Sequence, residues 1–156
     1  MYPMHIYLVR HAHAHDGEDD ASRPLSRKGL AQVRALGRQL RRNEAVKARI
    51  IWHSPLRRAK ETAYRLVEHW EEKVKICETS GLKPGDEPSL TARRLGDLKK
   101  PVIIVGHDPH LSALASLMVT GKAEPHRFHM KKGTMLRLDR ESGGWSVRWQ
   151  ISPEVL

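Results

Sequence analysis

Cysteine, aromatic side chains and long apolar runs are all scarce in this chain of 156 residues. The single cysteine, Cys77, excludes an intrachain disulfide and is typical of proteins that work in a reducing compartment. No apolar run approaches the roughly 18 residues that a membrane span needs. Residues 1–11 lack the basic start and the cleavage site of a secretory signal. We therefore expect a cytoplasmic protein that has no membrane partner.

Acidic residues are fewer than basic residues, and this imbalance makes the chain strongly basic. Asp and Glu number 18 against 28 Lys and Arg, which gives a net charge of +10 at pH 7. Such a surface attracts anions, and nucleic acid is the first partner that it suggests. The basic residues are spread out, however, and an aromatic fraction of 5% leaves few side chains on which bases would stack. A solvated basic face is the favoured interpretation, ahead of substrate attraction and well ahead of nucleic-acid binding.

Short runs that are rich in β-branched residues indicate the strands. Three of them are apolar throughout, as in strands whose sheet is covered on both faces, and they lie at residues 6–9, 50–52 and 102–105. A shorter and less regular run covers residues 74–77. These strands are expected to form a mostly parallel central sheet.

Helical patterns alternate with these runs. Apolar residues spaced three or four apart predict helices at residues 30–40, 56–70, 90–98 and 111–118. Ser26 is the predicted N-cap of the first helix. The alternation predicts an α/β fold, a three-layer sandwich with helices on both faces of the sheet.

The C-terminal part changes to a period of two residues. Residues 134–138 and 145–151 alternate apolar and polar side chains around residues 142–144, Ser-Gly-Gly, which is a hairpin signal. We expect this hairpin to add antiparallel strands at an edge of the sheet. No repeat or linker interrupts the chain, so residues 1–156 are expected to form a single domain.

Arginine and histidine recur where three of the predicted strands end. The first strand runs into Arg10 and His11, the second into residues 53–59, HSPLRRA, and the third into residues 106–109, GHDP. In open α/β sheets, active sites gather beyond the carboxyl ends of the strands. These residues are therefore expected to lie side by side.

This set of residues suits phosphoryl transfer. The planar fork of a guanidinium group matches two phosphate oxygens and stays charged in any surroundings. A neutral imidazole among arginines can attack phosphorus, because the neighbouring positive charge disfavours the protonated ring. A second histidine and the N-termini of the following helices would stabilise the transferring oxygens. This chemistry requires neither a metal nor a cofactor.

Taken in order, residues 10–12 (RHA), 54–59 (SPLRRA) and 106–107 (GH) resemble the motifs of the histidine phosphatase superfamily. The resemblance covers essentially the whole chain and implies a phosphoglycerate mutase-like fold. Within the superfamily, residues 23–26 (RPLS) and the Trp149 region are similar to the SixA-type phosphohistidine phosphatases. The resemblance thus implies a protein phosphohistidine or a small phosphorylated metabolite as substrate, and it leaves the oligomeric state open.

The resemblance also implies a role for each motif residue. His11 would be the nucleophile, and Arg10 and Arg58 would hold the phosphate. His107 would be the second histidine of the pocket. Arg23 matches an arginine that closes over the phosphate from a loop.

The proton donor is not implied by any motif, because mutase-like members carry it in an insertion that this chain lacks. Asp20, on the loop before Arg23, is a candidate for this role and for substrate binding, and Glu87 is a weaker one. Phosphohistidine substrates ease the problem, since an imidazole nitrogen leaves more readily than an alkoxide. Asp108 stands where asparagine is common, and it either orients a neighbouring group or weakens dianion binding.

Two alternatives from other functional classes remain. His11, His13 and His15 alternate after a strand, as in metal-dependent hydrolases, although no second cluster of carboxylates and histidines accompanies them. The chain is also compatible with a basic, non-catalytic binding module for RNA or an acidic protein. The favoured hypothesis is a metal-independent phosphatase that forms a phosphohistidine at His11.

Overall fold

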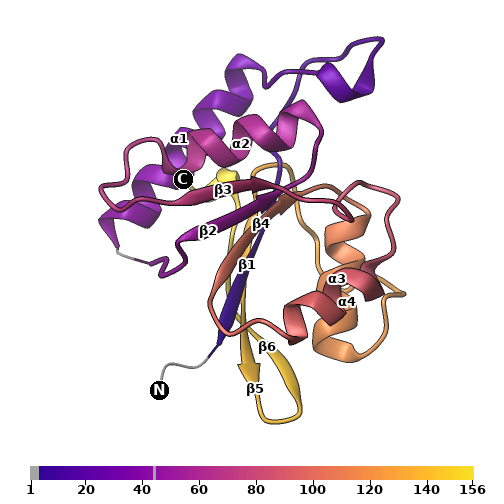
Figure 1. Cartoon of the computed structure of the whole chain (residues 1–156). Coiled ribbons are helices and arrows are strands. Elements are labelled where there is room, and N and C mark those ends of the chain that lie inside the picture. Colours follow the sequence, from indigo (N-terminus) through magenta and orange to yellow (C-terminus); the bar gives the residue numbers. More distant parts are fainter. Residues whose placement is uncertain (1–3, 44) are drawn as a thin grey trace.

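The computed structural model of the chain describes residues 4–43 and 45–156. The strands in this part of the chain are β1 (His5–Arg10), β2 (Ile50–His53), β3 (Lys75–Glu78), β4 (Val102–Gly106), β5 (Met135–Glu141) and β6 (Gly144–Ile151). They form one six-stranded sheet in the order β3-β2-β4-β1-β5-β6 (Figure 1). Strands β1 to β4 pair in parallel, whereas β5 pairs antiparallel with both β1 and β6. The mostly parallel sheet with a hairpin at its edge confirms the predicted architecture.

Helices cover both faces of this sheet. Figure 1 shows one pair on each side, α1 (Arg27–Arg42) with α2 (Arg57–Val67), and α3 (Pro88–Gly96) with α4 (His110–Thr120). Two separate apolar cores fill the space between the sheet and the two helical layers. The protein is therefore the three-layer α/β sandwich that the sequence predicts.

Strand β1 lies in the middle of this sandwich and buries both of its faces. Tyr7 and Val9 pack into the core beneath α1 and α2, whereas Ile6 and Leu8 pack into the core on the other face. Successive side chains of a strand point to opposite faces, and all four of these side chains are fully buried. This placement explains why the run has no alternation of polar residues.

The first helix begins as predicted. The hydroxyl of Ser26 accepts a hydrogen bond from the backbone nitrogen of Gly29 at 3.0 Å, which satisfies one of the free N–H groups of the first turn. Val33, Leu36 and Leu40 form the buried stripe of α1. The cap and the stripe therefore fix where the helix starts and which face it buries.

Several element boundaries differ from the predictions. Strand β3 lies one residue later than expected, because Lys75 is the partner of Ile50 in the register with β2. Helix α2 ends at Val67, so Trp70 lies beyond it, although this indole still packs against the core. Helix α3 begins earlier than expected, with Pro88 in its first turn, where a missing N–H costs little.

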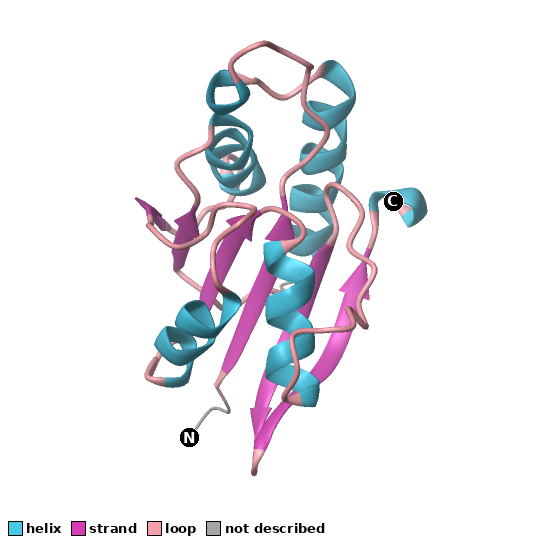
Figure 2. Ribbon diagram, turned by 90° about the vertical axis from the view of Figure 1, so that its right-hand side faces the viewer, coloured by secondary structure: helices cyan, strands magenta, loops and turns pink. Residues whose placement is uncertain are grey.

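The C-terminal hairpin returns the chain to the end of the sheet at which β1 ends. Because β5 is antiparallel to β1 and β6 is antiparallel to β5, β6 runs in the same direction as β1. The short 3₁₀ helix η2 (Pro153–Val155) follows β6 at this end of the molecule (Figure 2). The hairpin thus brings the C-terminal residues to the same end of the sheet as the loop after β1.

No helix within residues 4–43 and 45–156 has both the length and the apolarity to cross a bilayer. The segment predicted to lack a secretory signal includes residues 1–3, which lie outside the described residues.

Candidate active site

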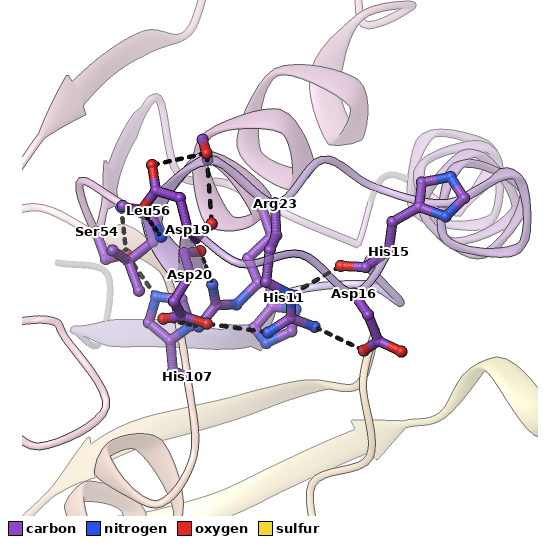
Figure 3. A network of polar contacts seen from close by, with 12 residues as sticks. His11, His15, Asp16, Asp19, Asp20, Arg23, Ser54, Leu56 and His107 are labelled. Atoms are coloured by element: carbon purple, nitrogen blue, oxygen red, sulfur yellow. Dashed lines mark hydrogen bonds and ion pairs between the residues drawn. The ribbon is translucent and has the colours of Figure 1, made fainter.

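The carboxyl ends of β1, β4 and β2 lie side by side, as predicted. The backbone nitrogen of His11 donates to the carbonyl of Gly106 at 2.9 Å, and that of Ser54 donates to the carbonyl of Val105 at 3.1 Å. His11, Ser54 and His107 consequently gather at one edge of the sheet (Figure 3). Helices α2 and α4 begin just beyond this edge, so that their free N–H groups favour an anion there.

His11 is 5% exposed, and its ring is oriented by its own backbone neighbour. Nδ1 lies 2.7 Å from the carbonyl oxygen of Ala12. A carbonyl only accepts, so Nδ1 carries the proton and Nε2 keeps its lone pair. Burial, together with the smaller effect of the charges of Arg58 and Arg10, lowers the pKa of His11 to about 3. The neutral imidazole was predicted from the arginines alone, whereas burial is the larger cause.

His107 is almost fully buried beside His11, and the centroids of the two rings are 5.1 Å apart. Its Nε2 lies 2.5 Å from the hydroxyl oxygen of Ser54. That oxygen also accepts a hydrogen bond from the backbone nitrogen of Leu56 at 3.2 Å. Burial lowers the pKa of the His107 imidazole to about 3, with smaller contributions from His11 and Arg58. The other ring nitrogen, Nδ1, has no hydrogen-bond partner among the described residues.

Two arginines enter the site from different elements. Arg58 lies in the first turn of α2, is 5% exposed, and donates through Nη1 to the carbonyl oxygen of Asp20 at 2.9 Å. Arg10, at the end of β1, donates through Nη1 to the carbonyl oxygen of Met130 at 2.9 Å. Its Nε is buried and has no partner in the described part of the chain. Both guanidinium groups are therefore held in place, and Arg10 keeps an unused donor.

The loop after His11 folds back onto Arg58 through a set of ion pairs. Arg23 donates through Nη1 to Asp20 Oδ1 at 3.0 Å and through Nε to the carbonyl oxygen of His15 at 2.7 Å (Figure 3). The hydrogen bond from Arg23 and the charge of Arg58 lower the pKa of the Asp20 carboxyl. The structure thus brings Arg23 and Asp20 to the site. An ionised carboxylate cannot donate a proton, so this arrangement does not suit the proton-donor role expected for Asp20.

The other two acidic residues singled out from the sequence cap helices. Glu87 is exposed, and its carboxylate accepts from the backbone nitrogen of Ser89 at the start of α3. Asp108 Oδ1 accepts from the backbone nitrogen of Ser112 at 3.0 Å, near the start of α4. Its Oδ2 lies 3.8 Å from Arg10 Nη1. Of the two roles expected for Asp108, the geometry favours the orientation of a neighbouring group.

His13 and His15 do not join His11 in a ligand set. His13 Nδ1 lies 2.6 Å from the hydroxyl oxygen of Ser26, at the start of α1. His15 is exposed, and its ring points away from His11 in Figure 3. Across the described residues, no group of three or more His, Cys, Asp or Glu side chains is placed to hold a metal ion. The loop that carries the alternating histidines therefore holds their side chains apart from one another.

Sequence reasoning missed two hydroxyl groups that support the site. Ser54 contacts His107, as described above. Thr62 Oγ1 accepts from the backbone nitrogen of Ala12 at 3.1 Å and donates to the carbonyl oxygen of Arg58 at 2.7 Å. Thr62 thus ties the loop of the nucleophile candidate to the helix of the arginine. Ser54 lies inside the motif of residues 54–59 and Thr62 lies three residues after it, but no sequence pattern indicated their hydrogen bonds.

Solved structures with this fold include several phosphatases. SixA, a protein histidine phosphatase complexed with tungstate, has a TM-score of 0.85 at 22% identity, over 97% of this chain and 98% of that chain. The α-ribazole phosphatase of Shigella flexneri has a TM-score of 0.79 at 17% identity, over 96% of both chains. A phosphoserine phosphatase variant of Entamoeba histolytica in complex with phosphoserine has a TM-score of 0.73 at 17% identity, over 98% of this chain and 99% of that chain. At these identities the likeness establishes a common fold.

A comparison with curated protein sequences found no match. The family model of the histidine phosphatase superfamily (branch 1), however, matches residues 6–83, which are half of the chain and include Arg10, His11 and Arg58. The match confirms the resemblance inferred from the motifs: the chain belongs to the histidine phosphatase superfamily.

Proposed function

We propose that residues 1–156 form a single-domain, metal-independent phosphohydrolase that transfers a phosphoryl group to His11 and then to water. The observation that carries this proposal is the hydrogen bond between His11 Nδ1 and the carbonyl oxygen of Ala12. It leaves the lone pair on Nε2, and the lowered pKa keeps the ring neutral at physiological pH. A neutral and oriented imidazole is a competent nucleophile.

The reaction has two phosphoryl-transfer steps. In the first, Nε2 of His11 attacks phosphorus while the bond from phosphorus to the leaving oxygen or nitrogen breaks. The leaving group takes that electron pair and a proton from solvent water. In the second, water attacks the phosphohistidine and loses a proton to solvent. The P–N bond breaks, its electron pair returns to Nε2, and inorganic phosphate leaves. Positioning and charge stabilisation are what the protein contributes to both steps.

We assign the phosphate oxygens to a ring of donors around His11. Arg58 would exchange its contact with Asp20 for the phosphate, and Arg10 would use its free Nε. Arg23 would close over the phosphate from the loop, and Asp20 would position the guanidinium group of Arg23. Charge-assisted donors of this kind stabilise the transition state.

His107 supplies a further donor in this proposal. The Ser54 oxygen already accepts from Leu56, and we assign its hydroxyl proton to the hydrogen bond with His107 Nε2. The imidazole proton then lies on Nδ1, the nitrogen that has no partner among the described residues. A buried N–H group without a partner is costly, and a phosphate oxygen would satisfy it.

We propose a protein phosphohistidine or a small phosphorylated metabolite in the cytoplasm as the substrate. SixA is a protein histidine phosphatase, and the Shigella flexneri neighbour is an α-ribazole phosphatase. An ionised Asp20 favours substrates that need little help from an acid, and an imidazole leaving group is of this kind. The single cysteine supports the location.

The test is a phosphatase assay on an aryl phosphate and on a phosphohistidine protein, with chelator present throughout. We expect activity to survive the chelator and to fall by at least about 10³-fold in His11→Ala. Arg58→Ala is expected to lose about 10²-fold, whereas Arg65→Ala, on the exposed face of the same helix, serves as the control. Acid-labile, alkali-stable phosphate should be trapped on the wild type and not on His11→Ala.

The other outcomes separate the alternatives. Full activity in His11→Ala would contradict the mechanism. Loss of activity with chelator would favour the metal-dependent hydrolase. Inactivity on both substrates, combined with salt-sensitive RNA binding, would favour the basic binding module.

A further inference from the structure

A cationic cavity lies next to the reacting residues. It has a volume of about 540 Å³, and its wall includes Arg10, His13, Lys28, Gln32, Lys132 and Glu154. Arg10 also belongs to the proposed phosphate site, so its side chain borders both that site and the cavity. The proposed reaction of a single phosphoryl group makes no use of the rest of this cavity.

The wall that carries Lys132 is fixed to the end of β1. The backbone nitrogen of Gly133 donates to the carbonyl oxygens of Arg10 and His11, at 3.0 Å and 3.1 Å. Gly133 has a φ of +82°, and a Cβ at this position would lie 2.8 Å from Pro153 Cγ. Only glycine combines this backbone conformation with so close a neighbour. The turn therefore holds Lys132 beside the nucleophile loop.

The opposite wall is the loop of His13 and the first turns of α1. The backbone nitrogen of His13 donates to Gln32 Oε1 at 3.0 Å, and its Nδ1 is engaged by Ser26. With the hydroxyl proton of Ser26 in this hydrogen bond, the ring proton of His13 lies on Nε2, from which it can be donated to an anion. Lys28 lies in the first turn of α1, where the helix dipole is also positive. Both walls thus direct positive charge to the same cavity.

The lysines of the cavity differ in their pairing. Lys131 Nζ lies 2.7 Å from Glu154 Oε2, so this lysine already has a carboxylate. Lys28 and Lys132 have no carboxylate within ion-pair distance in the described part of the chain. Burial lowers the pKa of His13, and the charges of both lysines add to this effect, as expected of cations that crowd one cavity. An anion placed here would relieve this repulsion.

We propose that His13, Lys28 and Lys132 form an anion subsite, which binds a second anionic group of the substrate. That group is a carboxylate or a phosphate on the same molecule as the phosphoryl group. Arg10 would lie between the two anions and fix their separation. This inference rests on the proposed function, and it defines the substrate class as phosphorylated molecules with a second negative charge.

Binding of inhibitor pairs tests the subsite. Alkylphosphonates and ω-carboxyalkylphosphonates of matched and increasing chain length are titrated calorimetrically into the full chain. The readout is the ratio of the two dissociation constants at each length, which cancels any general loss of the phosphate site. We expect the carboxylate to tighten binding by about fivefold at one favoured length, as for a partly exposed ion pair. Lys28→Gln combined with Lys132→Gln should bring the ratio close to one.

Two further variants complete the experiment. Lys122→Gln, an exposed lysine beyond the far end of α4, should keep the wild-type ratio. Glu154→Gln should raise the ratio, because it frees Lys131 for the ligand. Ratios close to one at every length in the wild type, or an unchanged ratio in the double variant, would overturn the subsite. Turnover of the aryl phosphate is scored separately, so that failure of the subsite is distinguished from failure of the phosphatase proposal.

Discussion

Arg58 binds Asp20 twice, through the backbone carbonyl oxygen at 2.9 Å and through carboxylate Oδ2 at 3.3 Å. The Arg58 side chain is buried, whereas that of Asp20 is exposed. A carboxylate thus occupies part of a guanidinium fork that the proposed function assigns to phosphate. The carboxylate can be displaced by substrate at the cost of one ion pair whose acidic partner is exposed, and such pairs are weak.

Asp20→Asn tests this competition. The backbone carbonyl still holds Arg58 Nη1, while the negative charge that opposes a phosphate dianion is removed. We expect inorganic phosphate to bind about fivefold more tightly, as for the loss of one like charge at a partly exposed site. Product inhibition and calorimetry both measure this affinity. Glu18→Gln, on the same exposed loop, is the control. Weaker phosphate binding in Asp20→Asn would show that the carboxylate assists binding instead.

Ser54→Ala is expected to remove the hydrogen bond that fixes the tautomer of His107. Without the hydroxyl, nothing in the described site holds the proton on Nδ1, so the donor proposed for the phosphate is populated only part of the time. We expect kcat/KM to fall about tenfold, which is less than the roughly 10²–10³-fold cost of removing an oriented donor outright, because the donor is still populated part of the time. Nitrogen chemical shifts of the His107 ring report the tautomer directly.

The matching control for Ser54→Ala is Thr120→Ala, which removes a hydroxyl at the far end of α4. Unchanged nitrogen shifts together with unchanged kcat/KM in Ser54→Ala would contradict the role given to this serine.

Gly29→Ala is expected to destabilise the protein at the site itself. A Cβ on Gly29 would overlap the carbonyl oxygen of His13, because the first turn of α1 packs directly on this loop. Overpacking against backbone costs about 1–3 kcal/mol, and urea denaturation measures it as a lower midpoint. Gly96→Ala, which meets no atom within 4 Å, is the control. Equal midpoints for Gly29→Ala and the wild type would show that the loop shifts to accommodate the added methyl group without loss of stability.

The arrangement of the motif residues could be predicted because parallel topology places the carboxyl ends of neighbouring strands together. Arg10, His11 and His107 need only the order β4-β1 to meet. The pairing of Arg58 with Asp20 depends instead on how an irregular loop closes, and no periodicity encodes that. The same limit applied to Ser54, whose role depends on a single side-chain hydrogen bond.

The anion subsite was beyond prediction for a related reason. Its walls come from the start of α1, the turn before β5 and the residues after β6. Each segment read alone is a solvated basic or polar stretch. Only the return of the hairpin to the edge where β1 ends brings them together.

The two buried histidines make stability depend on pH in a definite direction. The pKa values of His11 and His107 are lowered to about 3 by folding, from 6.5 in the unfolded chain. Between these values the unfolded state binds more protons than the folded state, so the free energy of unfolding falls as the pH falls. The contribution of each histidine is fully present above pH 6.5 and is lost on the way to pH 3.

His107→Gln isolates this effect from the other titrating groups. Well below pH 6.5, each such histidine contributes a slope of at most about 1.4 kcal/mol per pH unit, and the variant should lose that part of the wild-type slope. Urea unfolding of both proteins across mildly acidic pH gives the two slopes, and His69→Gln, an exposed histidine, is the control. The variant is expected to be less stable at neutral pH, since it disturbs the hydrogen bond with Ser54, but less sensitive to acid. Parallel slopes would show that His107 is already protonated in the folded protein, which would contradict the neutral pair of imidazoles on which the proposed chemistry depends.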